Sequence, residues 1–223
     1  MTYVISLRTS LTAALMAFAV IPMAQAATVN PTSYAMENGN GQASGGSFNY
    51  WDLNYTGAGS TNVDGSPLSG GLGDLTDGII APDNWFITEN AAGTGPYVGW
   101  LNKNPMIDFF FDVVQSFTSV TFYVDDAEGA GGVSQPASIT VNGTNYLTLL
   151  NPGSAPFAIT IELGSLFADE LNVQIFASNA WVFVSEVTFD GVPAPVPLPA
   201  GGVLLLGARA GLAALRRRGL RQF

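Results

Sequence analysis

The side chains that could carry chemistry in this 223-residue chain are carboxylates, because it has 17 Asp and Glu residues and no His or Cys. Without His and Cys, the familiar pairs of nucleophile and base cannot be assembled. Paired carboxylates can hydrolyse glycosidic bonds, but the sequence gives no separation between them, and the acidic positions fall in turns. We therefore expect no enzymatic activity and leave a carboxylate glycoside hydrolase as the alternative.

The densest acidic stretch is DDAEGAGG, which contains Asp125, Asp126 and Glu128. Its carboxylates and glycines could bind a cation, although the spacing differs from that of an EF-hand loop. The alternative is a solvated turn between two strands.

A group of aromatic residues forms a second candidate site. Trp85, Tyr97 and Trp100 flank the loop ENAAGTGPYVGW. Aromatic faces can stack on sugar rings while nearby Asn and Asp hold the hydroxyls, so we expect a ligand platform here. The alternative is core packing, the usual role of such residues in a sandwich.

The charge of the chain is unevenly distributed. Residues 27–192 contain all 17 acidic residues and only one basic residue, Lys103, so this body carries a net charge of −16. A nucleic-acid partner is excluded as implausible, because phosphate binding needs clustered Lys and Arg. Bound cations would relieve the self-repulsion; a solvated acidic surface is the alternative.

The body has the pattern of an all-β sandwich. Period-two alternation predicts strands within 106–114, 119–126, 157–163, 170–178 and 180–191, and Asn142-Gly143 predicts a hairpin within 137–150. We expect a short turn over 163–170. The first half is rich in Gly, Asn and Ser, and there we expect an edge strand over 48–55 between long loops. A disordered linker is the alternative, and the aromatic residues of this half argue against it: Tyr50, Trp51, Tyr55, Trp85, Phe86 and Trp100.

The two ends of the chain have the composition of targeting segments. Arg8, an apolar run from Leu11 to Val20 and Ala24-Gln25-Ala26 predict a signal peptide over residues 1–26, cut by signal peptidase; an N-terminal anchor is the alternative. At the other end, alternating prolines precede an apolar stretch, Leu198–Leu215, which is about 27 Å long as a helix. Because an arginine cluster follows, this stretch predicts a single transmembrane helix.

The C-terminal pattern resembles the VPLPA variety of the PEP-CTERM sorting signal of Gram-negative bacteria. The motif residues are Val196, Pro197, Leu198, Pro199 and Ala200, and the closing cluster is Arg216, Arg217 and Arg218. The resemblance implies that residues 193–223 are a sorting tail recognised by an exosortase-type transpeptidase after transient anchoring in the inner membrane. Arg209 departs from the pattern, which puts cleavage of the tail in doubt.

The body is similar to the galactose-binding-like jelly roll of discoidin-type and lectin-type modules. LTDGIIAPDNWF, PMIDFFFDVVQSFTSVTFYV and VSEVTFDG occur in the order of that fold. The resemblance implies a calcium site in which Asp77 matches the loop aspartate and Glu186 the strand glutamate, with Asp74 beside them; calcium prefers such oxygen ligands. The alternative is an Asx-turn at Asp77 and a solvated Glu186.

Together these features predict an exported, non-catalytic protein with a signal peptide (1–26), a jelly-roll β-sandwich (27–192) and a sorting tail (193–223). We expect it at the cell-envelope surface or outside the cell, binding carbohydrate, with exopolysaccharide as the expected partner. The alternative is a structural matrix protein that associates through cations.

Overall fold

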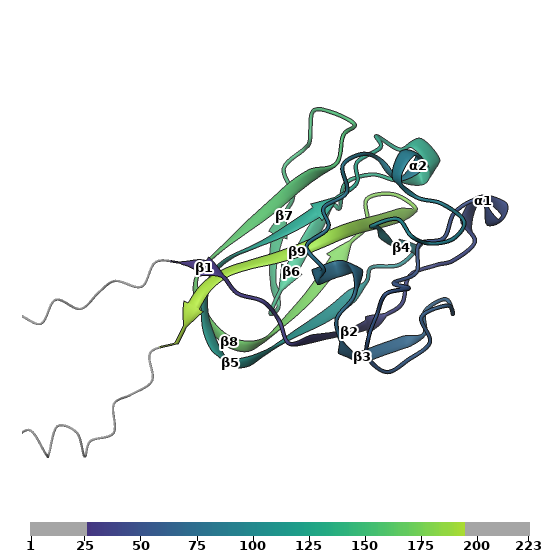
Figure 1. Ribbon diagram of the computed structural model, residues 1–223. Helices are drawn as coiled ribbons and strands as arrows, with labels where there is room; N and C mark the ends of the chain where they lie inside the picture. Colours follow the sequence, from purple (N-terminus) through teal and green to yellow (C-terminus); the bar gives the residue numbers. More distant parts are fainter. Residues whose placement is uncertain (1–25, 195–223) are drawn as a thin grey trace, which may run out of the picture.

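The computed structural model describes residues 26–194, and every long element in this range is a β-strand (Figure 1). The all-β prediction is confirmed. The helical elements are single turns: α1 (Ala43–Gly46), α2 (Trp85–Thr88) and the 3₁₀ turns η1 (Asp74–Thr76) and η2 (Ala130–Gly132). The strands are β1 (Ala27–Thr28), β2 (Ser33–Glu37), β3 (Pro67–Gly71), β4 (Val98–Leu101), β5 (Met106–Val124), β6 (Ser138–Val141), β7 (Thr144–Leu147), β8 (Phe157–Phe176) and β9 (Trp181–Pro193).

Strand β5 joins two halves of one antiparallel sheet. Its first residues, up to Phe110, pair with β2 and with the end of β8, while residues 115–124 pair with β9 and with the beginning of β8. The rings of Phe109, in the first half, and Phe189, in β9, lie 4.9 Å apart, so the two halves face each other across a core. The sequence predicted two strands here; the structure has one strand whose register breaks after Phe110.

Strand β8 also continues where we predicted a turn. Between Glu162 and Leu166 the pairing with β5 skips residues on β8, and Gly164 adopts a φ of +71°. This is an irregularity inside a strand, in which the extra residues bulge and bend the ribbon without ending it. The turn predicted over 163–170 is therefore wrong.

Most residues on the predicted alternating faces are buried in the core. Ile107, Phe109 and Phe111 are buried from β5, and the same holds for Val120, Phe122 and Val124 and for Leu171, Val173 and Ile175. In β8, Ile161 is buried, whereas Ile159 and Leu163 only pack against the core from the side. A second, smaller cluster built around Tyr50, Tyr97 and Phe183 lies beside it.

The hairpin prediction is confirmed and the strand over 48–55 is wrong. Asn142 and Gly143 have φ values of 45° and 81° and connect β6 to β7. Residues 49–55 run as a loop instead, because Tyr50 and Tyr55 are both buried and no alternating face forms. The aromatic residues in this Gly-rich region therefore anchor a loop to the core.

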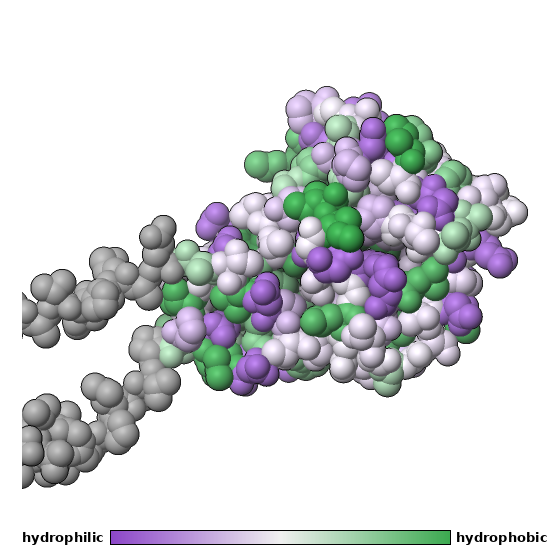
Figure 2. Space-filling view, viewed as in Figure 1, coloured by the Kyte–Doolittle hydropathy of each residue, from purple (hydrophilic) through white to green (hydrophobic). Residues whose placement is uncertain are grey.

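Between residues 26 and 194, no helix is long and apolar enough to cross a membrane. The predicted signal peptide, apart from Ala26, and the motif from Val196 to Arg218 lie outside the described residues. The face in Figure 2 shows hydrophilic and hydrophobic residues interspersed.

Candidate functional site

The loop after η1 and strand β9 meet where the sequence predicted a cation site. The backbone N–H of Gly78 donates a hydrogen bond of 3.0 Å to Oε2 of Glu186. The carboxylate of Asp77 accepts one of 2.8 Å from the N–H of Ile79, so Asp77 forms the Asx-turn that we held as the alternative. Glu186 is buried, not solvated. The structure thus brings the loop and the strand glutamate together.

Asp74 points to a deeper acid that the sequence analysis missed. The N–H of Asp74 donates to Oδ1 of Asp52 at 3.1 Å, and Tyr34 donates its hydroxyl to the other oxygen of Asp52. Asn54 donates to Oδ1 of Asp74 at 2.7 Å, while Oδ2 of Asp74 is buried without a hydrogen-bond partner. The signal for Asp52 was its position in the aromatic run NYWDLNY, in which Tyr50 and Tyr55 are buried.

Burial and mutual repulsion raise the pKa of these carboxyls. The pKa of Asp74 is raised to about 7, first by burial and then by the charge of Asp52. Burial, with the charge of Asp77, raises the pKa of Glu186 to about 7. Burial also raises the pKa of Asp52 and of Asp77. Because negative charges are crowded at low dielectric, a cation here would be favoured.

The donor chemistry of this region fits calcium, with one restriction. Oxygen ligands are present, and the orphaned Oδ2 of Asp74 is a buried acceptor that lacks a donor. However, no three carboxylates within residues 26–194 converge closely enough to hold an ion by themselves. Backbone carbonyls of the glycine-rich loop would have to complete the ligand set.

The acidic stretch after β5 does not act as one cluster. Asp125 is fully buried and accepts hydrogen bonds from the N–H of Trp85 at 2.8 Å and from the amide of Asn84 at 2.9 Å. Asp126 accepts two backbone N–H groups of its own loop, and Glu128 is exposed. Asp125 therefore fixes the start of α2, a role that neither interpretation of this stretch included.

The three aromatic candidates occupy different environments. Trp100 is fully buried and donates its indole N–H to the carbonyl of Glu37 at 2.9 Å. Tyr97 is buried and donates its hydroxyl to the carbonyl of Asp83 at 3.0 Å. This burial matches the packing alternative. Trp85 remains partly exposed, with its ring edge-on to Phe48 at 5.0 Å.

A cleft of about 520 Å³ opens beside the acidic stretch. Gln135 organises it: its side chain accepts the N–H of Asn151 at 2.6 Å and donates to the carbonyl of Leu149 at 3.2 Å. Glu128 and Leu150 are exposed in its wall. Seven of its ten lining residues carry carboxylate, amide or hydroxyl groups, although most of the exposed lining surface is apolar. The ten are Asp126, Glu128, Ser134, Gln135, Pro136, Ala137, Thr148, Leu150, Asn151 and Ser178.

Comparison with protein families supports the discoidin-type resemblance over part of the body. Residues 31–131 match the model described as the discoidin domain-containing receptor 1/2, DS-like domain. A discoidin domain-containing receptor tyrosine kinase B of Caenorhabditis elegans is 25% identical over an alignment of 158 residues, which covers 63% of this chain and 19% of that protein. The chain thus spans about a fifth of the length of this curated relative.

Solved structures overlap with the chain only in part. Truncated AlyQ with CBM32 and alginate lyase domains has a TM-score of 0.36 and 10% identity, covering 56% of this chain and 30% of that one. The family 32 CBM from C. perfringens NanJ, in complex with galactose, has a TM-score of 0.30 and 10% identity, covering 44% of this chain and 79% of that one.

Proposed function

We propose that this chain is an exported, non-catalytic binding module of the jelly-roll type whose ligand is a carbohydrate. The observation that carries the proposal is the cleft of about 520 Å³, in which hydroxyl, amide and carboxylate groups meet apolar surface at one opening. Sugars are recognised by such groups, because each hydroxyl of the ligand both donates and accepts. The exposed Leu150 adds apolar surface for a sugar face.

The cleft supports binding rather than hydrolysis. A glycosidase needs two carboxylates on opposite sides of the bond, about 5 to 9.5 Å apart. Asp126 and Glu128 come from one short loop, and Asp126 is occupied by the backbone N–H groups of Glu128 and Gln135. We assign Glu128 to hydrogen bonding with the ligand and Trp85, whose ring lies against Gly131, to supporting the loop that carries it.

Calcium has a structural role in this proposal. Asp77, Glu186 and Asp74, with loop carbonyls, would hold the ion, which neutralises the crowded acids and fixes the loop to β9. The supporting observations are the hydrogen bond between Gly78 and Glu186 and the unpartnered oxygen of Asp74. The ion would stabilise the fold without contacting the sugar, since none of its three proposed carboxylate ligands lines the cleft.

The proposed location is the cell-envelope surface or the extracellular matrix, with exopolysaccharide as the ligand source. Similarity to a domain of a receptor supports an exported body. The targeting segments that would take it there are the signal peptide and the sorting tail from Pro193, by way of signal peptidase and an exosortase-type enzyme.

A titration against polysaccharide tests the proposal. Isothermal calorimetry of the protein with purified exopolysaccharide, and a glycan array in calcium and in EDTA, should show saturable binding. Glu128→Gln and Ser134→Ala should each raise the dissociation constant for the glycan about tenfold, because each removes one hydrogen bond to the ligand. Asp112→Asn, on the exposed bend of β5, is the matched control. Absence of binding to every glycan in both buffers would overturn the proposal.

The charge of the body favours a second candidate, a structural matrix protein. Residues 27–192 have a net charge of −16, so divalent cations could bridge two copies. Sedimentation that shows calcium-dependent association, together with no glycan affinity, would select this role over the first.

A further inference from the structure

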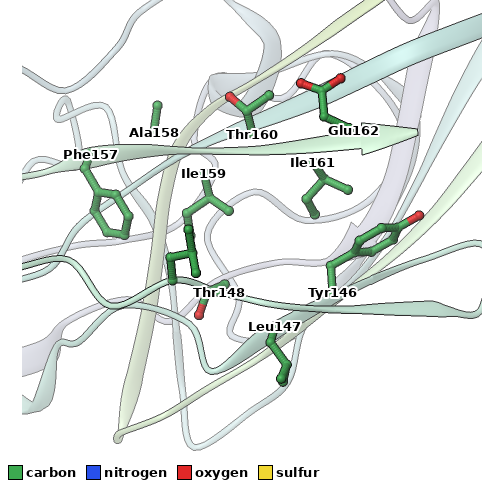
Figure 3. Close-up of a pocket in the computed structure, with 10 residues that line it drawn as sticks. Tyr146, Leu147, Thr148, Phe157, Ala158, Ile159, Thr160, Ile161 and Glu162 are labelled. Atoms are coloured by element: carbon green, nitrogen blue, oxygen red, sulfur yellow. The ribbon is translucent and has the colours of Figure 1, made fainter. Parts of the chain in front are cut away.

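A second, largely apolar groove of about 360 Å³ adjoins the cleft, and Thr148 lines both (Figure 3). One wall is β7 with the residues after it, and the other is the first half of β8. Phe157, Ile159 and Ile161 point towards Tyr146 and Leu147, while Ala158, Thr160 and Glu162 point away. The floor is therefore aliphatic and aromatic.

The β8 wall of this groove is a free strand edge. Between Phe157 and Ala168, β8 pairs with β5 on one side, and β6 pairs only with residues 173–176. No backbone hydrogen bond within residues 26–194 joins 157–168 to any segment other than β5. An unpaired edge beside an apolar groove is a template for an added strand, since main-chain groups supply affinity and the groove takes alternate side chains.

Two leucines that line the groove are almost fully exposed. Leu147 and Leu149 have exposed fractions of 81% and 88%. A cluster of large aliphatic side chains left in water marks an interaction surface. The exposed leucines favour an occupant with apolar side chains, and the free edge of β8 favours a peptide.

Charge identifies the segment of this chain that fits. Residues 195–223 contain five of its seven basic residues and no acidic residue, whereas the body carries −16. They also contain the apolar run Val203-Leu204-Leu205-Leu206. The N-terminal apolar run has only Arg8 beside it. A second copy of the body would bring two strongly negative surfaces together.

The connection is short enough. Ser119 of β5 pairs with Glu162 on one side and with Asp190 on the other, so a strand added to β8 lies three strand spacings, about 14 Å, from β9. The ten residues from Ala194 to Val203 can span about 30 Å. Because β8 and β9 are both antiparallel to β5, a chain that leaves β9 and turns back runs antiparallel to β8.

We propose that the groove binds the chain's own segment Val203–Leu206, which lies outside the described residues, as a strand added to β8 when the tail is not in a bilayer. The arginines beyond it then face the acidic body. This goes beyond carbohydrate binding: the body competes with the membrane for the sorting tail, and Arg209, which is costly in a bilayer, favours the body.

Disulfide trapping in the full chain tests the proposal, because the chain has no native cysteine. Thr160→Cys is combined in turn with cysteine at each position from 203 to 206, and the protein is oxidised without lipid. At least one pair should close an intramolecular disulfide ten times faster than Ile87→Cys with the same tail cysteine, since paired strands lie within disulfide range. Ile87 is exposed and does not line the groove.

A groove variant and two alternative occupants complete the test. Leu149→Glu, at an exposed position, should slow trapping at least tenfold and leave the near-ultraviolet dichroism unchanged. Equal rates for groove and control pairs would overturn the proposal. Faster trapping of Leu15→Cys, or disulfides between chains whose yield rises with concentration, would overturn it in favour of the N-terminal segment or a second copy. Glycan binding does not enter these readouts.

Discussion

At the scale of single residues, the unusual feature is a pair of carboxyls, Asp74 and Glu186, whose pKa the fold raises towards neutral pH. Burial raises the pKa of Asp74 to about 7, well above the value of about 4 in an unfolded chain. The folded chain therefore binds this proton more tightly. The stabilisation is complete below about pH 4, declines as the pH rises through 7 and is lost above that.

Asp74→Asn removes this pH dependence. In EDTA at pH 8, the variant should be more stable than the parent by about 1 to 3 kcal/mol, and at pH 4 the two should be equal. Urea unfolding at the two pH values measures both. With millimolar calcium the order at pH 8 should reverse, because the parent alone keeps the ligand. Parallel pH profiles for the two proteins would show that Asp74 does not titrate as described.

Removing the carboxylate of Asp125 should destabilise the protein, in contrast to the substitution at Asp74. Its carboxylate satisfies two donors at the start of α2, so Asp125→Ala leaves the N–H of Trp85 and the amide of Asn84 without that acceptor. We expect a loss of about 2 to 4 kcal/mol in the free energy of unfolding, measured in urea. Asp112→Ala, at an exposed position, should change it by less than about 0.5 kcal/mol. Equal effects would contradict this anchoring role.

At the scale of elements, β4 and β9 approach the loop at Tyr50 so closely that one position tolerates only glycine. A Cβ added at Gly99 would lie 1.8 Å from Cε1 of Phe183. Gly99→Ala should therefore lower the free energy of unfolding by about 2 kcal/mol or more, as overpacking does. Gly153→Ala, where the added Cβ meets nothing within 4 Å, is the control. Chemical denaturation followed by tryptophan fluorescence compares them.

The elements also show what the sequence could predict. Alternation identified the buried faces of β5 and of the second half of β8, and Asn142-Gly143 identified the hairpin, because both are local signals. The continuity of β5 and β8 through their bends depends on partners far away in the chain, so local patterns broke each into two. Asp77 and Glu186 came from resemblance. Asp52 was missed, since its burial follows from how the 49–55 loop packs.

At the scale of the whole molecule, the main electrostatic feature is the net charge of −16 on residues 27–192. Lys103 is the single basic residue of this range and already pairs with Glu37 at 2.7 Å. Repulsion among the remaining acids opposes the compact state, and salt screens that repulsion. We therefore expect the melting temperature to rise by several degrees, about 1 to 2 kcal/mol in stability, between 10 mM and 500 mM NaCl at pH 8.

Calcium should act more strongly than this screening. At matched ionic strength, 2 mM CaCl₂ should raise the melting temperature more than 2 mM MgCl₂, because a flexible loop of carbonyls and carboxylates suits the larger ion. Differential scanning calorimetry separates the two effects, and Glu186→Gln tells a local site from a diffuse ion atmosphere. The variant should keep the NaCl response and lose most of the preference for calcium. If it loses neither, the divalent ions act on the acidic surface as a whole, and the matrix role with cation-bridged copies becomes the better account of the −16 charge.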